Sequence, residues 1–172
     1  NGTLIATIMV HVVTHAIDIG ISALSTANIL AIMGGIAIVG TIITGIAGDK
    51  IGIKRTFIIS FFVVTASYFW LATIEEIWMF YLFAVAVGLI SNMGLLTSPL
   101  VAESFGLKAH GLIFGVINLS YSLGSAAGPL LASYIFDTTD SYMMAFLIYG
   151  TLGIVAVMVA SMLRPTRLEK TF

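Results

Sequence analysis

The stretch Gly45-Ile-Ala-Gly-Asp-Lys-Ile-Gly-Ile-Lys-Arg55 concentrates charges in a chain that has very few of them. It separates two long uncharged segments, residues 19–48 and 56–74. Charged residues make up 9% of the 172 residues and hydrophobic residues 59%, whereas soluble domains carry roughly 25% charged residues. So few charges do not cover the surface of a water-soluble globule. The composition therefore predicts a membrane protein.

In the rest of the chain, charged residues likewise separate long uncharged segments. A helix that crosses a bilayer needs about 20 apolar residues, and no segment alternates like a strand of a membrane barrel. The sequence therefore predicts an all-α membrane protein with six transmembrane helices. The expected spans are Thr3–Ile17, Thr26–Ala47, Thr56–Thr73, Ile77–Pro99, Leu112–Phe136 and Met143–Leu163. Because Asn1 already lies in a hydrophobic run, we expect the first span to be truncated.

The distribution of positive charge predicts the orientation. All seven lysines and arginines fall in segments 48–55, 102–111 and 164–172, which lie on one side of a six-helix bundle. The segments on the other side carry only acidic residues: Asp18, Glu75, Glu76, Asp137 and Asp140. Positive charge accumulates on the cytoplasmic side of membrane proteins. We therefore expect both ends of the chain to be cytoplasmic, in a multi-pass protein of the cell membrane.

Glycines and bulky residues repeat in a pattern that predicts internal symmetry. The second and fifth spans are rich in glycine: Gly34, Gly35, Gly40 and Gly45, and then Gly111, Gly115, Gly124 and Gly128. The third and sixth spans carry large phenylalanine and methionine side chains instead. An inverted 3+3 repeat, typical of secondary transporters, accounts for this pattern. Ordinary variation among membrane helices is the alternative.

The charged stretch has a physical interpretation of its own. Gly45 lets a helix end approach a neighbour, and Gly52 lets the chain reverse within a few residues. Asp49 is placed where it could accept hydrogen bonds from the N–H groups that begin another helix. The simpler alternative is a basic cytoplasmic loop in which Asp49 is only solvated.

The pattern G-x-x-x-D-K-x-G-x-K-R resembles the signature loop of the major facilitator superfamily, which follows the second helix of each six-helix half. The resemblance implies that Asp49 caps the fifth helix of the same half, near His110–Leu112. It also implies that Lys50, Lys54 and Arg55 join Asp49 in a charge network that holds an inner gate closed. These residues, with Gly45 and Gly52, form the expected gate loop.

Two further segments resemble monocarboxylate-porter-like and oxalate/formate-antiporter-like members of that superfamily. They are His11-Val-Val-Thr-His-Ala-Ile-Asp-Ile-Gly-Ile-Ser22 and Gly124-Ser-Ala-Ala-Gly-Pro129. The resemblance identifies residues 1–172 as the C-terminal half, helices seven to twelve, whose partner is a missing N-terminal six-helix half. Such relatives usually carry an arginine near the position of Thr41, so recognition of an anion by this half is in doubt.

Polar side chains within the spans are the candidate cavity or substrate residues. They are His11, His15, Asn28, Thr41, Asn92, Asn118, Tyr121, Ser122 and Ser125. In the fifth span, Asn118, Ser122 and Ser125 follow helical spacing and share one stripe. Imidazole titrates near physiological pH, so His11 or His15 is a candidate for proton coupling. The alternative for each residue is a structural hydrogen bond within or between helices.

The sequence predicts secondary active transport of a small solute, with a carboxylate as one candidate, by alternating access within the lipid bilayer. No enzyme activity, catalytic residue, metal or cofactor is expected, since cysteine is absent and no phosphate-binding loop occurs. With a net charge of -1, the chain has no basic field for nucleic acid. A membrane scaffold or assembly subunit is the main alternative, and an intramembrane protease or a channel is less favoured.

Overall fold

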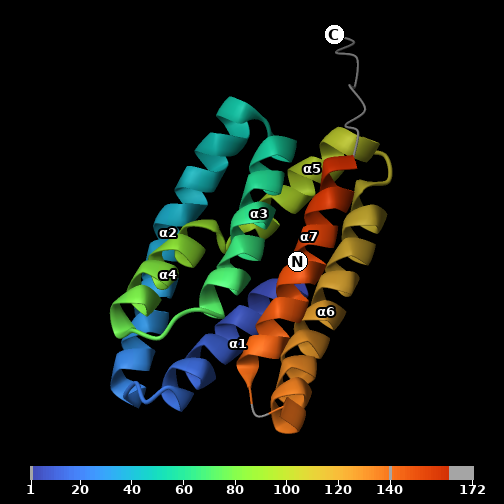
Figure 1. Ribbon diagram of the computed structural model, residues 1–172. Helices are drawn as coiled ribbons and strands as arrows, with labels where there is room; N and C mark the ends of the chain where they lie inside the picture. Colours follow the sequence, from blue (N-terminus) through green and yellow to red (C-terminus); the bar gives the residue numbers. More distant parts are fainter. Residues whose placement is uncertain (1, 140, 163–172) are drawn as a thin grey trace.

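The computed structural model describes residues 2–139 and 141–162, and these residues are helical apart from short connections (Figure 1). No strand occurs in this part of the chain. The helices are α1 (Gly2–Asp18), α2 (Ala23–Ile51), α3 (Ile53–Leu71), α4 (Ile77–Ile90), the short 3₁₀ helix η1 (Met93–Leu96), α5 (Thr97–Phe105), α6 (His110–Thr139) and α7 (Tyr142–Met162). The all-α prediction is confirmed.

Four helical stretches in the described residues are long and apolar enough to cross a membrane. They are Ala23–Ile51, Ile77–Phe105, His110–Thr139 and Tyr142–Met162, and the second of them runs from α4 through η1 to α5. The helix α1, with 17 residues, is shorter. The helix α3 is less apolar because Lys54 and Arg55 lie in its first turn. By composition, four of the six expected spans are therefore supported.

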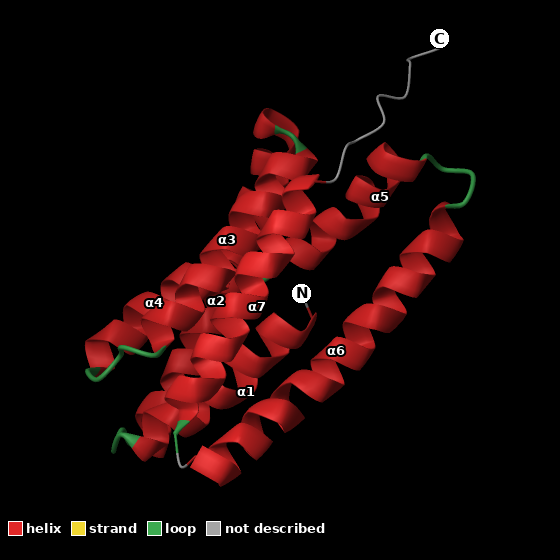
Figure 2. Cartoon of the chain, turned by 45° about the vertical axis from the view of Figure 1, so that its right-hand side comes forward, coloured by secondary structure: helices red, strands yellow, loops and turns green. Residues whose placement is uncertain are grey.

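The helices associate in three principal pairs: α2 with α4, α1 with α6, and α3 with α7 (Figure 2). Glycines bring two of these pairs close together. A Cβ atom at Gly40 of α2 would lie 2.4 Å from the backbone oxygen of Leu89, which precedes the end of α4. On α6, a Cβ atom at Gly128 would lie 2.6 Å from Thr7 Oγ1 of α1. Small residues at these crossings allow the backbones to approach each other.

The core lies where α1, α3, α4 and α7 meet. Its largest members are aromatic, and Tyr68, Phe80, Phe83 and Phe146 are fully buried. Phe61, one of the large side chains of the third expected span, is also buried, at 5% exposure. Phe62, the next residue, is 63% exposed, so α3 has a buried and an exposed face.

The two ends of the bundle differ in charge. One end, here called the basic end, contains the α2–α3 turn and the α5–α6 connection, with Lys50, Lys54, Arg55 and Lys108 (Figure 1). The opposite end, the acidic end, contains Asp18, Glu75, Glu76 and Asp137, and no lysine or arginine among the described residues. Arg164, Arg167, Lys170 and Asp140, which the sequence assigned to these two sides, lie outside the described residues.

Candidate functional site

A crevice between α5 and α6 brings together part of the expected cavity. It consists of two neighbouring hollows of about 190 and 220 Å³ that share Thr97, Ile117 and Tyr121 as lining residues. The other lining residues are Gly94, Phe114 and Asn118 in one hollow, and Gly2, Thr3, Phe57 and Ser120 in the other. Hydroxyl, amide and aromatic groups line this α5–α6 crevice, and none of the described residues that line it is charged.

The expected stripe on α6 is divided by α1. Asn118 lines the crevice, and its Nδ2 donates to Phe114 O at 2.8 Å. Ser125 instead lies under the start of α1, where a Cβ atom at Gly2 would be 2.6 Å from Ser125 Oγ. Ser122 is exposed and belongs to neither hollow. Helical spacing placed these residues on one stripe, but α1 crosses that stripe and separates its members.

The predicted site residues Thr41 and Asn92 contact each other across two helices. Asn92 Nδ2 donates to Thr41 Oγ1 at 2.6 Å and to Ala37 O at 3.0 Å. Asn92 lies between the end of α4 and the start of η1, where the fourth span departs from α-helical geometry. These bonds connect the non-helical segment after α4 to α2. They support a structural role for the side chains of Asn92 and Thr41. Asn28 is exposed near the start of α2, away from this contact.

His11 is hydrogen-bonded to α6 at the proline in that helix. Pro129 lies inside α6 and has no N–H to donate to the preceding turn. His11 Nε2 lies 3.0 Å from Pro129 O, and because a carbonyl only accepts, this nitrogen carries the proton. Tyr149 of α7 donates its hydroxyl to the neighbouring Gly128 O at 2.6 Å. Two side chains, one from α1 and one from α7, thus bind successive carbonyls of α6. For His11, this supports a structural hydrogen bond between helices.

The tyrosine in this arrangement leads to a stability prediction. Tyr149→Phe removes one hydrogen bond at little cost in packing, and we expect it to lower the free energy of unfolding by about 0.6–1.7 kcal/mol. Unfolding of the full-length protein in detergent, followed by circular dichroism, measures this change. Tyr134→Phe is the matched control, since Tyr134 lies on α6, the helix that the Tyr149 hydroxyl binds, and is 67% exposed. Equal stabilities of the two variants would contradict the assigned role of the Tyr149 hydroxyl.

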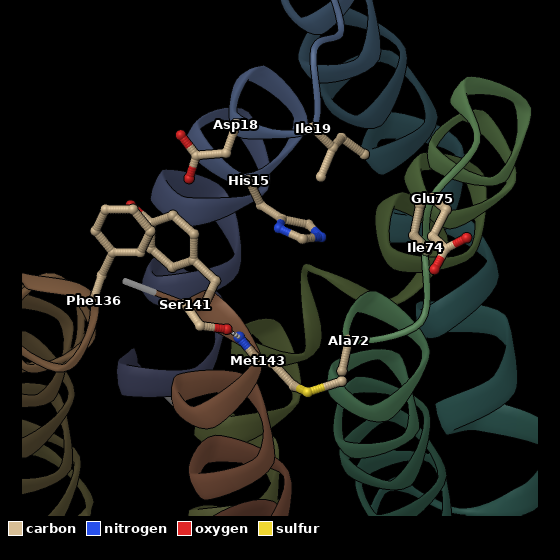
Figure 3. A pocket seen from close by; sticks show the side chains of 10 residues that line it. His15, Asp18, Ile19, Ala72, Ile74, Glu75, Phe136, Ser141 and Met143 are labelled. Atoms are coloured by element: carbon tan, nitrogen blue, oxygen red, sulfur yellow. Dashed lines mark hydrogen bonds between the residues drawn. The ribbon is translucent and has the colours of Figure 1, made fainter. Parts of the chain in front are cut away.

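His15 lies one turn beyond His11 on α1, in a different environment. It lines a pocket of about 320 Å³ at the acidic end (Figure 3). Its Nε2 is buried and has no hydrogen-bond partner among the described residues. Of the two histidines that the sequence singled out, His15 therefore retains a free ring nitrogen, whereas His11 Nε2 is used in a bond between helices.

The predicted gate loop is mostly helical. Gly45, Asp49 and Lys50 belong to the last turns of α2, and Lys54 and Arg55 to the first turn of α3. Gly52 alone separates the two helices, with φ of +93°, a conformation that favours glycine. The expected reversal at Gly52 is thus confirmed, but it takes one residue. Lys54 Nζ donates to Ser161 O of α7 at 2.9 Å.

The expected cap of α6 by Asp49 does not form in this part of the protein. Asp49 is exposed, and no hydrogen bond or ion pair of its carboxylate occurs among the described residues. The helix α2 packs mainly on α4, whereas the start of α6 lies across the bundle beside α5 (Figure 1). The resemblance therefore misplaced the partner of Asp49 within this half. This partner was inferred from the loop motif, which carries no information on helix packing.

His110, at the start of α6, has a different neighbour. Its Nε2 lies 3.2 Å from Ser98 Oγ of α5, a contact that the sequence did not predict. A serine–histidine pair is activated for nucleophilic attack when a third group orients the histidine. Nδ1 of His110 is buried and has no hydrogen-bond partner among the described residues. The pair connects α5 to α6 and lacks the third member of a catalytic arrangement.

Thr97, Pro129 and Tyr149 were not among the expected site residues. Thr97 begins α5 after the break in the fourth span and lines both hollows of the crevice. Its signal was the polar run Thr97-Ser98 before Pro99, which indicates a break in an apolar span. Pro129 inside a predicted helix leaves the carbonyl of Ser125 without its helical donor, whereas His11 and Tyr149 bind the carbonyls of Pro129 and Gly128, which only the packing identifies.

Taken together, apolar helices, exposed apolar faces and charges confined to the two ends define a multi-pass helical membrane protein. The chain matches the Major Facilitator Superfamily over residues 1–171 and belongs to that family. It is 26% identical to "Monocarboxylate transporter 12" of Rattus norvegicus over 148 residues. This match covers 83% of this chain and 30% of the relative. It is 28% identical over 128 residues to "Sialic acid transporter NanX" of Escherichia coli strain K12, covering 71% of this chain and 31% of that relative. The chain thus spans about 30% of the length of these curated relatives.

Proposed function

We propose that this chain is the C-terminal six-helix half of a secondary active transporter, which moves a small solute by alternating access. The α5–α6 crevice is the observation that carries the proposal. Its polar groups lie beside a broken membrane span, and such backbone breaks persist at membrane depth where they line a cavity or are covered by protein. Binding sites of secondary transporters are typically formed by discontinuous helices of this kind. The protein is accordingly a transporter rather than an enzyme.

The pairing of helices supports an inverted repeat. If α1, α2 and α3 correspond to α4–α5, α6 and α7, the pair α2–α4 corresponds to α6–α1, and the pair α3–α7 corresponds to itself. Both equivalent crossings are made close by glycine, at Gly40 in one and at Gly124 and Gly128 in the other. Two three-helix units of this kind entering the membrane from opposite sides would account for the pattern of glycines in the sequence.

The chemistry of the crevice limits what this half recognises. Its lining offers Thr97, Asn118, Ser120 and Tyr121 for hydrogen bonds and Phe57 and Phe114 for apolar contact. We propose that it binds the uncharged part of the solute. A carboxylate, which the names of the relatives suggest, would then be bound by a cation in the other six-helix half. The position of Thr41, where an arginine was expected, is instead part of the neutral contact with Asn92.

The two charged ends support an orientation. Basic residues favour the cytoplasmic side, so we propose that the basic end faces the cytoplasm and the acidic end the outside of the cell membrane. The exposed apolar faces of α2 and α6 would then contact lipid or the N-terminal half. Their large exposed side chains include Ile38, Ile42, Ile43, Leu112, Val116, Leu119, Leu123 and Leu130.

Accessibility to water tests the crevice directly. The 172 residues contain no cysteine, so single replacements report on one position each in this half. In the full-length protein freed of other cysteines, we expect Thr97→Cys and Asn118→Cys to react with a charged methanethiosulfonate reagent. Their rates should exceed those of lipid-facing positions by about tenfold or more, because the thiolate reacts where water reaches it. A transported solute should slow the reaction at both positions.

Two positions on the opposite faces provide the controls. Phe62 of α3 and Met158 of α7 are 63% and 54% exposed and lie beside an apolar hollow. Cysteine at either position should react slowly, since lipid covers it. Equal rates at the crevice and control positions would refute the proposed cavity.

A further inference from the structure

The pocket at the acidic end forms where three segments meet (Figure 3). The helix α1 contributes His15 and Asp18, and the connection between α3 and α4 contributes Ile74 and Glu75. The end of α6 and the start of α7 contribute Phe136, Ser141, Tyr142 and Met143. The two charged residues in its lining, Asp18 and Glu75, are both carboxylates. The pocket therefore offers negative charge around one imidazole.

Aromatic rings surround that imidazole on its buried side. Its centroid lies 5.3 Å from that of Phe146, 5.9 Å from that of Phe80 and 6.2 Å from that of Tyr142. Nε2 is buried without a hydrogen-bond partner, which is costly for a polar atom. This differs from His11, whose Nε2 donates to a carbonyl of α6. The fold thus leaves one ring nitrogen of His15 unused next to carboxylates and aromatic faces.

We propose that His15 is a proton-binding site at the acidic end of the protein. A proton from water adds to the unprotonated ring nitrogen, no covalent bond breaks, and the imidazolium donates from both nitrogens. Burial of the ring opposes the charged form, whereas the carboxylate of Asp18 favours it, and aromatic rings within about 6 Å stabilise a cation. Among the described residues, the titratable groups that line the pocket with the ring are Asp18, Glu75 and the phenol of Tyr142.

Proton binding has a structural consequence. A positive charge on α1 would attract Glu75 on the α3–α4 connection and so bind two elements of the acidic end together. Asp18 lies one turn beyond His15 on α1 itself, so its interaction with the ring is local. Asp18 is the charged group that acts on the ring, and Glu75 lines the same pocket, so each carboxylate is tested separately. Protonation of the ring can be measured without knowledge of the solute.

Nuclear magnetic resonance tests the site in the intact protein. The full-length protein is labelled with ¹⁵N-histidine in lipid nanodiscs, and its imidazole signals are followed from about pH 4.5 to pH 9, a range that spans the ordinary histidine pKa. The signal of His15 is assigned by its loss in His15→Gln. If that variant does not fold, the signals lost in His11→Asn and in His110→Gln are assigned to those two residues, and His15 is assigned by elimination within this half. We expect this signal to titrate with a single midpoint.

The two carboxylate variants decide whether the site is the proposed one. Asp18→Asn and Glu75→Gln should each lower the midpoint by roughly half a unit to one unit, since each removes a charge that favours the imidazolium. Asp137→Asn is the matched control, because Asp137 is exposed at the same end but does not line the pocket. The proposal is overturned if His15 stays neutral throughout, or if both carboxylate variants behave like Asp137→Asn.

Discussion

Gly40→Ala is expected to lower the free energy of unfolding of the full-length protein by about 2–3 kcal/mol, the range of severe overpacking. The added Cβ atom would lie 2.4, 2.6 and 2.7 Å from the O, C and Cα atoms of Leu89. All three are backbone atoms, so no side chain can rotate to relieve the clash. The helices α2 and α4 must separate, and their packing is lost along the crossing. Denaturant unfolding in detergent measures the effect.

Gly35→Ala is the matched control for this change. Gly35 lies on the same helix, and no atom lies within 4 Å of a Cβ atom built there. Alanine is favoured over glycine within a helix by about 0.8–1 kcal/mol, so this variant should be as stable as the wild type or more so. If the two alanine variants are equally stable, then α2 and α4 do not cross at Gly40 as described.

Asp49→Asn is expected to shift the ratio of inward-open to outward-open protein about tenfold toward the inward-open state, which corresponds to about 1.4 kcal/mol. Asp49 lies in the last turn of α2, where the helix dipole disfavours a negative charge. Lys50 shares this turn, but the Asp49 carboxylate makes no hydrogen bond or ion pair among the described residues. We therefore infer that the carboxylate is bound by the N-terminal half when the gate at the basic end is closed.

Double electron–electron resonance between spin labels across the basic end of the full-length protein measures this ratio. Glu103→Gln serves as the matched variant, since Glu103 is an exposed carboxylate of α5 at the same end. It should leave the distance distribution unchanged. An Asp49→Asn distribution that is indistinguishable from the wild type would leave Asp49 as a solvated residue of the turn.

The helices were largely predictable from the sequence because hydrophobicity and charge determine where a membrane span begins and ends. The fifth expected span, Leu112–Phe136, lies within α6, and the expected reversal occurs at Gly52. Boundaries at the basic end were less accurate. The charges of the gate loop indicated a loop, whereas the backbone remains helical up to Ile51 because exposed charged side chains are compatible with a helix end.

The candidate site was less predictable because its geometry depends on which helices cross. Asn118 and Tyr121 line the crevice, but Ser125 lies under α1, and periodicity along α6 cannot indicate where α1 crosses it. The contact between Asn92 and Thr41 joins residues that are 51 positions apart. The spacing of His11 and His15 places both on one face of α1. In the structure, however, His11 binds a carbonyl of α6, whereas His15 lines a pocket.

Solute counterflow in proteoliposomes tests the central claim, that this protein transports a small solute through a site at the α5–α6 crevice. Vesicles holding the full-length protein are loaded with one unlabelled compound from a panel of small carboxylates, and uptake of the labelled compound is followed. We predict saturable counterflow of at least one compound, reduced about tenfold or more by Tyr121→Ala in the crevice, as expected when a binding contact of about 1.4 kcal/mol or more is lost. Phe62→Ala, on the opposite face, should retain it. The account is contradicted if no compound exchanges, or if both variants transport equally.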